Sequence, residues 1–286
     1  MGNNEFAVRL VSGLLEARTG QKLNKDRHWR IDTALSGLLR ERGIASVDAL
    51  VNQLLQPQQN ELAQAVVEAL LNNETYFFRD RAMFDLLSNR VLPAIAERRA
   101  ASRRIAIWSA GCSTGQEVYS LAMMLLEQRS RWAGWTIEIV GTDISSAVIK
   151  TAREGCYTSF QVQRGLGVQQ MLTYFEETDR GWKASQQIQR MVRFEEHSIL
   201  NPPPLPGSFD LVLCRNVLLY FDGPTRTRAL DRLAQAMAPE GLLMLGGGET
   251  TVGHSELLEP STQFSGMFTM ASPRRNAIPN RPRLAG

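Results

Sequence analysis

Hydrophobic side chains follow a helical period through the first quarter of the chain. In residues 1–71 they recur every three or four positions, as in helices that bury one face. Gly20 and Gly43 stand where such helices should end, and Ser46 and Asn60 stand where they should begin. No strand pattern occurs in this stretch, so we predict an all-helical N-terminal bundle of four helices.

The period changes near residue 104, where short apolar runs begin to alternate with amphipathic segments. We predict buried strands at 104–111, 135–144, 209–216 and 241–247, and helices at 114–129, 145–155 and 225–238. This alternation indicates an α/β fold in which a parallel, doubly wound sheet has helices on both faces. The stretch between the second helix and the third strand is too long for an ordinary loop. We therefore expect an inserted small β subdomain at about 157–195, which includes the run IQRMVRFEEH (188–197).

Three further segments complete the predicted domain organisation. The segment 72–81, NNETYFFRDR, sets three aromatic residues between polar ones where the bundle gives way to the sheet, and we interpret it as a linker. The α/β domain is predicted over 82–271, beginning with a helix that runs to about Arg99. The last fifteen residues, 272–286, carry four arginines and no acid, are rich in proline and lack an apolar period. We expect them to form a disordered basic tail.

Composition narrows the classes of protein and of site. Hydrophobic residues make up 43% of the chain and charged residues 21%, which is typical of a globular protein. The apolar runs are shorter than the ~18–20 residues of a membrane span, and the start is amphipathic, so we expect a cytoplasmic protein without direct membrane insertion. The cysteines and histidines are scattered, which predicts no metal site. The net charge of +3 depends on the arginines of the tail and gives no argument for nucleic acid as a partner.

Candidate chemistry lies beyond the carboxyl ends of the strands, where open parallel sheets bind ligands. Those ends read SAGCSTG, GTDI, SIL and CRN. In the first, Gly111 and Gly115 precede a helix, so the backbone can approach a ligand closely, although a tight turn alone explains them equally well. Asp143 ends the second strand, where an acid binds ribose hydroxyls or caps the next helix. Together they favour a nucleoside ligand, and without a P-loop or a second glycine-rich half we expect S-adenosylmethionine rather than NAD.

Four motifs occur in order along the chain: NNETYFFRD, WSAGCSTGQEVYSLAM, GTDIS and CRNVLLYFD. From about residue 5 to residue 270 the sequence resembles the CheR-type chemotaxis protein-glutamate O-methyltransferases. The resemblance implies a Rossmann-like methyltransferase sheet that binds S-adenosyl-L-methionine. It also implies methyl transfer to glutamate side chains of chemoreceptor cytoplasmic helices, which yields glutamate methyl esters and S-adenosyl-L-homocysteine in sensory adaptation.

The glycine turn and the resemblance together give the candidate site residues. Arg79 and Tyr220 are the catalytic candidates. The candidates for cofactor binding are Asn73, Thr75, Arg79, Gly111, Glu117, Asp143, Ser198, Ile199, Arg215 and Asn216. The family often has Asn-Leu-Leu where this chain has Ser198-Ile199-Leu200, so at this position backbone contacts to adenine are expected rather than an Asn side-chain contact.

A glutamate acceptor sets simple demands on the enzyme. Its pKa is near ~4.3, so at neutral pH it is already an anionic nucleophile and needs no general base. The protein has to align and desolvate it. We expect Arg79 to hold the carboxylate with its guanidinium fork, and Tyr220 to orient it or line the methyl passage. The plainer alternatives are a surface ion pair for Arg79 and a core aromatic for Tyr220.

The resemblance implies a chemoreceptor (methyl-accepting chemotaxis protein) as partner, docked on the bundle. Between Gly20 and Gly43 six basic residues stand against three acidic ones, although a solvated helix face explains them too; the basic residues are Lys22, Lys25, Arg27, Arg30, Arg40 and Arg42. The insert has a short central loop with Gly181, so we expect no dependence on a receptor pentapeptide. Nothing in the sequence requires more than a monomer.

Two other functions compete with this interpretation. A non-catalytic module could bind S-adenosylmethionine as a sensor or scaffold in a receptor array, but Arg79 and Tyr220 are both present and favour catalysis. A methyltransferase for another acceptor is suggested by NPPP (201–204). That motif precedes the third strand and lacks the aromatic residue that would stack on a base, so we interpret it as a stiff loop.

Overall fold

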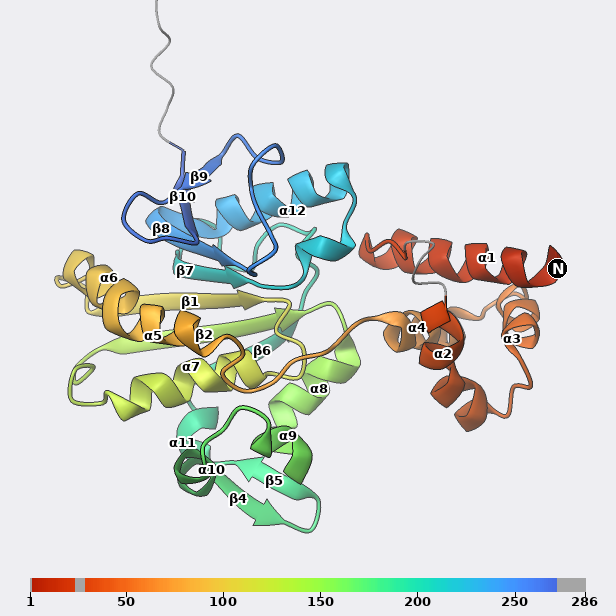
Figure 1. The fold of residues 1–286 in the computed structure, drawn as a ribbon, viewed down its shortest axis with the longest axis horizontal. Coiled ribbons are helices and arrows are strands. Elements are labelled where there is room, and N and C mark those ends of the chain that lie inside the picture. The colour runs from red at the N-terminus through yellow and green to blue at the C-terminus, as the bar shows by residue number, and fades with distance from the viewer. Residues whose placement is uncertain (1, 24–28, 272–286) are drawn as a thin grey trace, which may run out of the picture.

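The computed structural model describes residues 2–23 and 29–271 (Figure 1). Lys25 and Arg27 of the expected basic face, and the tail 272–286, lie outside the described residues. The helices predicted for the N-terminal bundle are present as α1 (Gly2–Thr19), α2 (Trp29–Arg42), α3 (Val47–Leu54) and α4 (Asn60–Leu70). Their apolar faces meet in one core with fully buried Val11, Leu35 and Leu50. The bundle therefore has a hydrophobic core of its own.

Local signals set the ends of these helices as the sequence predicts. Gly20 and Gly43 follow α1 and α2 with φ angles of +75° and +65°, a conformation that costs glycine little. The Ser46 hydroxyl accepts a hydrogen bond from the Ala49 N–H at 3.1 Å and caps α3.

The α/β body is built on a seven-stranded sheet in the order β6-β2-β1-β7-β8-β10-β9. Its strands are β1 (Arg104–Ala110), β2 (Thr136–Asp143), β6 (Val192–Glu196), β7 (Phe209–Cys214), β8 (Met237–Leu245), β9 (Leu258–Pro260) and β10 (Met267–Met270). The first five strands in this order, β6, β2, β1, β7 and β8, run parallel, whereas β10 pairs antiparallel with β8 and β9. This topology confirms the predicted α/β fold.

Helices cover both faces of this sheet (Figure 1). They are α5 (Arg81–Leu86), the π-helical turn η2 (Leu87–Val91), α6 (Leu92–Arg98), α7 (Gln116–Glu127), α8 (Ser146–Glu154) and α12 (Gly223–Ala236). Successive residues of β1 point to opposite faces. Ile107 packs in the core beneath α7, and Trp108 packs in the separate core beneath α12. The sheet is thus doubly wound and Rossmann-like.

A small three-stranded sheet in the order β3-β5-β4 follows α8. This insert contains β3 (Cys156–Tyr157), α9 (Ser159–Gln163), α10 (Val168–Tyr174), β4 (Phe175–Thr178), β5 (Gly181–Ala184) and α11 (Gln186–Gln189). The prediction that the run at 188–197 belongs to the insert is wrong, because its strand β6 pairs in the main sheet, parallel to β2 with Phe194 opposite Gly141. Phe194 is buried there, and a Cβ on Gly141 would lie 2.8 Å from its ring. A short alternating run looks the same in either sheet, so the pattern could not distinguish them.

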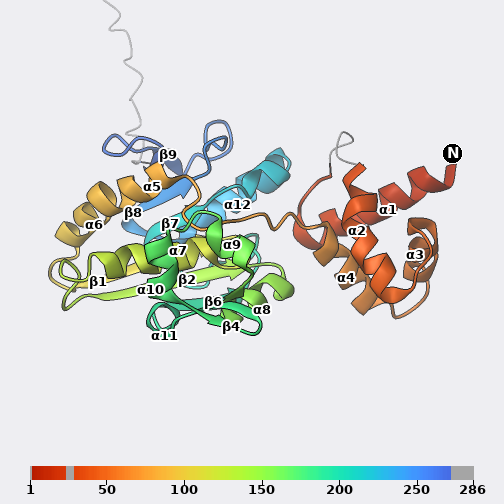
Figure 2. The same cartoon turned by 60° about the horizontal axis from the view of Figure 1, so that its bottom comes forward.

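The bundle lies at one end of the molecule, and the chain runs from α4 to α5 through an extended segment (Figure 2). Lys22, expected on the docking face, instead pairs with Glu16 at 3.1 Å and with Asp222 of the α/β body at 3.0 Å. Next to it Gln21 forms an isolated bridge with Phe221. In the described part of the chain, no helix has both the length and the apolar character needed to cross a membrane.

Candidate active site

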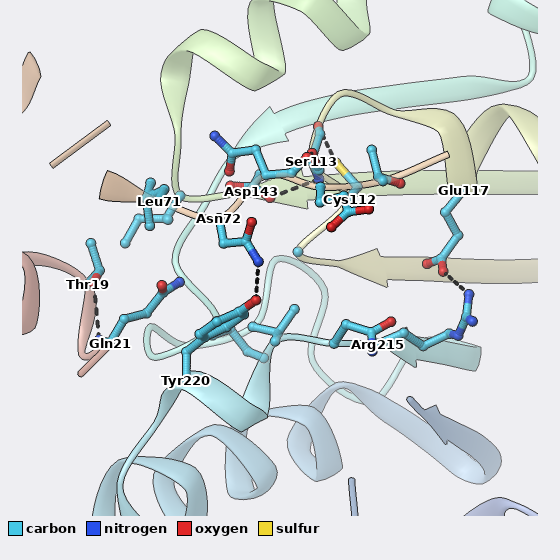
Figure 3. Close-up of a pocket in the computed structure, with 18 of the residues that line it drawn as sticks. Thr19, Gln21, Leu71, Asn72, Cys112, Ser113, Glu117, Asp143, Arg215 and Tyr220 are labelled. Carbon is cyan, nitrogen blue, oxygen red and sulfur yellow. Dashed lines mark hydrogen bonds and ion pairs between the residues drawn. The ribbon is translucent and has the colours of Figure 1, made fainter. Parts of the chain in front are cut away.

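A cleft lies beyond the carboxyl ends of β1, β2, β6 and β7, and the segment between α4 and α5 lines its other side. It encloses about 920 Å³, part of which is open to solvent. All the predicted site residues line it: Asn73, Thr75, Arg79, Gly111, Glu117, Asp143, Ser198, Ile199, Arg215, Asn216 and Tyr220. The structure therefore brings together residues from four separate motifs, and Figure 3 shows how several of them face the same space.

One side of the cleft, the strand-end wall, consists of residues 111–113 after β1 and Asp143 at the end of β2. The Asp143 carboxylate accepts hydrogen bonds from the Ser113 N–H at 2.9 Å (Figure 3) and from the Ser145 N–H at 3.0 Å. Only 9% of Asp143 is exposed, and this burial raises the pKa of its carboxyl above the ordinary value. The Ser145 side chain, not Asp143, caps α8. Asp143 is therefore held by backbone in a fixed position.

The opposite side, the linker wall, consists of residues 72–80 and is tied to the sheet by Arg215. The Arg215 side chain is 4% exposed and contacts Glu117 of α7 at 2.8 Å (Figure 3). It also contacts the carboxylate of Asp80 and the Arg79 carbonyl, the latter at 3.3 Å. The other oxygen of Glu117 accepts a hydrogen bond from the Ser109 hydroxyl at 2.9 Å. A charge network centred on the buried Arg215 thus joins β1, α7 and the segment after β7 to the linker wall.

The linker wall presents Arg79 and meets Tyr220 from the short helix η3 (Leu218–Tyr220). Asn72 donates a hydrogen bond to the Tyr220 hydroxyl (Figure 3). One nitrogen of Arg79 donates to the Glu74 carbonyl at 3.2 Å, and its guanidinium lies 5.6 Å from the centre of the Tyr76 ring. Among the described residues, no carboxylate forms an ion pair with Arg79. Its charge is available to a ligand in the cleft.

Strained backbone is concentrated around this cleft. Phe78, Asp80, Ser113 and Asn216 have φ angles of +50°, +62°, +51° and +61°, values that non-glycine residues adopt at a cost. Three of the four lie in the linker wall or the strand-end wall, and Asn216 lies between β7 and η3. The surrounding hydrogen bonds therefore hold the cleft in a conformation that the chain would not adopt alone.

The family assignment follows from comparison with known proteins. A family model described as the CheR methyltransferase, SAM binding domain, matches residues 73–266. The chain belongs to the CheR methyltransferase family. The resemblance predicted from the four motifs is confirmed, and the protein is a methyltransferase that depends on S-adenosyl-L-methionine.

Individual relatives match most of the chain. A chemotaxis protein methyltransferase of Vibrio parahaemolyticus is 34% identical over 254 residues, which cover 88% of this chain and 91% of the relative. Chemotaxis protein methyltransferase 1 of Pseudomonas aeruginosa is 35% identical over 251 residues, with 86% and 90% covered. A chemotaxis protein methyltransferase of Borreliella burgdorferi is 31% identical over 243 residues, with 83% and 86% covered.

The donor set of this CheR-family cleft fits S-adenosyl-L-methionine. Asp143 offers a carboxylate at the end of β2, where ribose hydroxyls bind in nucleoside-binding sheets. His197 after β6 lines the cleft, and its Nε2 is buried with no hydrogen-bond partner among the described residues. Burial lowers the pKa of His197, so its ring is neutral at pH 7 and can hydrogen-bond a polar base edge. Ile144 and Ile199 add apolar surface beside it.

Sequence reasoning missed Glu249, which holds the backbone of one of the segments that line the cleft. Its carboxylate accepts hydrogen bonds from the N–H groups of Asn216 and Gly246, each at 2.8 Å, and of Leu219 at 3.2 Å. It thereby holds the segment that carries Asn216 and Tyr220. Glu249 follows the carboxyl end of β8, so the strand-end rule already applied to four other strands would have found it.

Glu68 of α4 was also missed, and it fixes the bundle against the strand-end wall. Its carboxylate accepts a hydrogen bond from the Ser146 N–H at 3.0 Å and also bonds the Ser145 hydroxyl. A carboxylate at the N-terminus of α8 is favourable because the free N–H groups and the helix dipole attract negative charge there. No sequence pattern signals this contact, because Glu68 and Ser145 are far apart in the chain.

Proposed function

We propose that this CheR-family enzyme methylates glutamate side chains in the cytoplasmic helices of a chemoreceptor. The guanidinium of Arg79 carries the proposal: it lines the same cleft as Tyr220 and forms no ion pair with a described carboxylate, so it offers a binding place for a carboxylate acceptor. The chemotaxis names of the relatives support a receptor as the partner. We further propose that the protein acts in the cytoplasm as a monomer.

The chemistry divides between the cofactor and the chain. S-adenosyl-L-methionine supplies an activated methyl group on a sulfonium, which remains as the thioether of S-adenosyl-L-homocysteine after transfer. Asp143, Gly111 and the segment 197–199 would hold the nucleoside part against the strand-end wall. Asn73, Thr75 and the polar groups of Glu117, Arg215 and Asn216 would complete the lining of the cleft.

The acceptor needs orientation rather than deprotonation, because a glutamate is ionised at neutral pH. Arg79 would hold one or both carboxylate oxygens through its N–H groups. Tyr220, itself positioned by Asn72, would line the path of the methyl group and exclude water from it. These roles require no general base.

The insert supports independence from a receptor pentapeptide. β4 and β5 are four residues each and are joined by only Asp179 and Arg180. Gly181 then has a φ of +121°, and a Cβ there would lie 2.4 Å from the Tyr157 carbonyl oxygen, so this turn is tightly packed. We therefore propose that recognition relies on the receptor helices themselves.

Methyl transfer to a purified chemoreceptor cytoplasmic fragment tests the proposal. With radiolabelled S-adenosyl-L-methionine, we expect label in the receptor that mild alkali releases as methanol. Arg79→Ala and Tyr220→Phe should lower transfer by about tenfold or more while the Kd for S-adenosyl-L-homocysteine stays within about threefold. Arg104→Ala, which breaks an exposed pair with Glu138 at the far end of β1, is the matched control and should change neither value.

Two results would contradict the proposal in different ways. Label that resists alkali would mean a different acceptor atom, such as an amine. Cofactor binding without transfer to any receptor fragment would instead support a sensor or scaffold.

A further inference from the structure

Two arginines from distant segments share one aromatic ring at the rim of the cleft. The Arg79 guanidinium lies 5.6 Å from the centre of the Tyr76 ring, and the Arg164 guanidinium lies 4.3 Å from the same centre. Arg164 follows α9 of the insert, whereas Arg79 and Tyr76 belong to the linker wall. Stacking on a ring limits the motion of both side chains and leaves their N–H edges free to bind anions.

Arg164 already holds a carboxylate in this structure. Its Nη2 contacts Glu74 of the linker wall at 2.8 Å, and Arg164 and then Arg79 lower the pKa of that carboxyl. The side chains of Arg164 and Glu74 are 42% and 58% exposed. An ion pair with this much solvent contact is weak, so a second carboxylate can displace Glu74 from Arg164 at little cost.

Positive charge is in excess at this rim. Arg81 adds a third guanidinium, which donates to the Gly165 carbonyl at 3.2 Å. Asp80 is already bound by the buried Arg215. Among the residues that the structure describes, Glu74 is the one carboxylate paired with any of the three rim arginines, so the rim attracts acidic groups.

We propose that Arg164, stacked on Tyr76, is a second carboxylate-binding subsite for the acceptor helix. It takes an acidic side chain that lies one or two helical turns from the glutamate held by Arg79, and Glu74 is the resident counter-ion that this side chain displaces. The inference rests on the proposed function and adds a requirement to it: the substrate is a helix with acidic residues in pairs, not an isolated glutamate.

The geometry limits the spacing of such a pair. Both guanidinium carbons lie over the same ring, so they are at most about 10 Å apart. Residues three or four apart on a helix have Cβ atoms about 5–6 Å apart, and residues seven apart are separated by about 10.5 Å along the axis. Acidic neighbours at three, four or seven positions therefore fit the two arginines, whereas neighbours at two or five face elsewhere.

Kinetics with the full-length enzyme and the receptor fragment test this subsite. For Arg164→Ala we expect the KM for the fragment to rise about three- to tenfold, with kcat and the Kd for S-adenosyl-L-homocysteine within about twofold. Arg164→Lys should recover part of the loss because it keeps the charge. Arg180→Ala is the matched control: Arg180 is another exposed arginine of the insert, paired with Glu154 at 2.7 Å, and its loss should leave the KM unchanged.

Changes on the acceptor side separate carboxylate binding from a structural role of Arg164. Replacing an acidic neighbour of the methylated glutamate by Gln, at three, four or seven positions, should raise the KM of the wild-type enzyme but not further that of Arg164→Ala. Glu74→Gln should act in the opposite direction and lower the KM, because it removes the resident competitor.

The outcomes distinguish the subsite from the proposed function. An Arg164→Ala enzyme with an unchanged KM, or one that still responds to the acidic neighbours, overturns the subsite and leaves glutamate methylation intact. If the wild type methylates no fragment, the proposed function fails. Fluorescence anisotropy of the labelled fragment then decides the subsite: weaker binding by Arg164→Ala than by Arg180→Ala supports it, and equal binding overturns it.

Discussion

The strand-end wall and the linker wall face each other across one cleft, but different interactions hold them. Asp143 of the strand-end wall is bound by two backbone N–H groups, one from Ser113 in the turn after β1 and one from Ser145 in the turn after β2. The linker wall is bound by side chains that come from elsewhere: Arg215 after β7, Tyr220 in η3 and Arg164 in the insert. One wall follows from the pairing of neighbouring parallel strands and from backbone N–H groups at their ends, and the other depends on side chains from several separate segments.

This difference predicts where each wall is vulnerable. Backbone hydrogen bonds persist when a neighbouring side chain changes, so substitutions in the strand-end wall should affect mainly the ligand that it binds. A side-chain network loses several contacts at once when its central member is removed. Substitutions there should change stability, the position of Arg79 and catalysis together.

Arg215→Ala is expected to have the largest effect. Removing this guanidinium leaves Glu117 and Asp80 without their counter-charge, and the Glu117 side chain is nearly buried. The loss should therefore cost about 3–5 kcal/mol of unfolding free energy. Arg79 should lose its position as well, so methyl transfer should fall about 100-fold or more. Denaturant unfolding and single-turnover transfer measure the two losses.

Arg99→Ala provides the control for this experiment. Arg99 pairs with the buried Asp210 at the opposite end of β7. Its loss should therefore lower stability, but the rate of methyl transfer per folded molecule should stay unchanged. If Arg215→Ala behaved in the same way, the linker wall would not need the charge network for its function.

Asp143→Asn comes next and tests the strand-end wall. Loss of the charge should weaken binding of S-adenosyl-L-homocysteine about ten- to a hundredfold while the fold persists. In the wild type, burial raises the pKa of Asp143 above 3.8, so affinity should decrease as the pH falls through that raised pKa. Isothermal titration calorimetry between pH 4 and pH 7 measures this slope, and Asp143→Asn should remove it.

The contribution of Asp143 to folding stability should change with pH in the opposite direction to cofactor affinity. Because the folded-state pKa of Asp143 lies above its unfolded value, the folded protein binds the proton more tightly, and ionisation costs stability as the pH rises through that range. Asp222 is the contrast: Thr225 and Lys22 lower its pKa to about 2, so its contribution is present above pH 3.8 and lost as the pH falls towards 2. An acid-labile contribution from Asp143 would contradict this assignment.

The two walls also differ in how far the sequence predicts them. Gly111 and Asp143 could be placed because both follow predicted strands, and parallel strands bring their carboxyl ends to one edge. Arg79 and Tyr220 were found through motifs, but their partners were not, because contacts between residues such as Asn72 and Tyr220 depend on how distant segments pack. The same limitation explains the assignment of β6 to the insert: periodicity gives a strand, not the sheet that it joins.

Glu249→Gln should have a smaller effect, on the segment that carries Asn216 and Tyr220. A glutamine keeps one acceptor oxygen but brings its own N–H₂ group against a backbone N–H, so one to two of the three hydrogen bonds are lost. We expect kcat to fall about tenfold and stability by about 1–3 kcal/mol. Glu256→Gln, an exposed change between β8 and β9, is the control. An unchanged kcat with lowered stability would limit Glu249 to a structural role.

Glu68→Gln should have the smallest effect. The direction in which it shifts the pH dependence of cofactor binding tests whether the bundle acts on the strand-end wall through charge. Weaker bonding to the N-terminus of α8 should cost about 0.5–1 kcal/mol of stability. The negative charge of Glu68 is also one cause of the raised pKa of Asp143, so its removal should shift the pH midpoint of cofactor affinity downward. Calorimetric titration across pH detects this shift, and Glu61→Gln, on an exposed position of the same helix, should leave the midpoint in place. An upward shift would mean that the bundle affects Asp143 through the backbone of α8 rather than through charge.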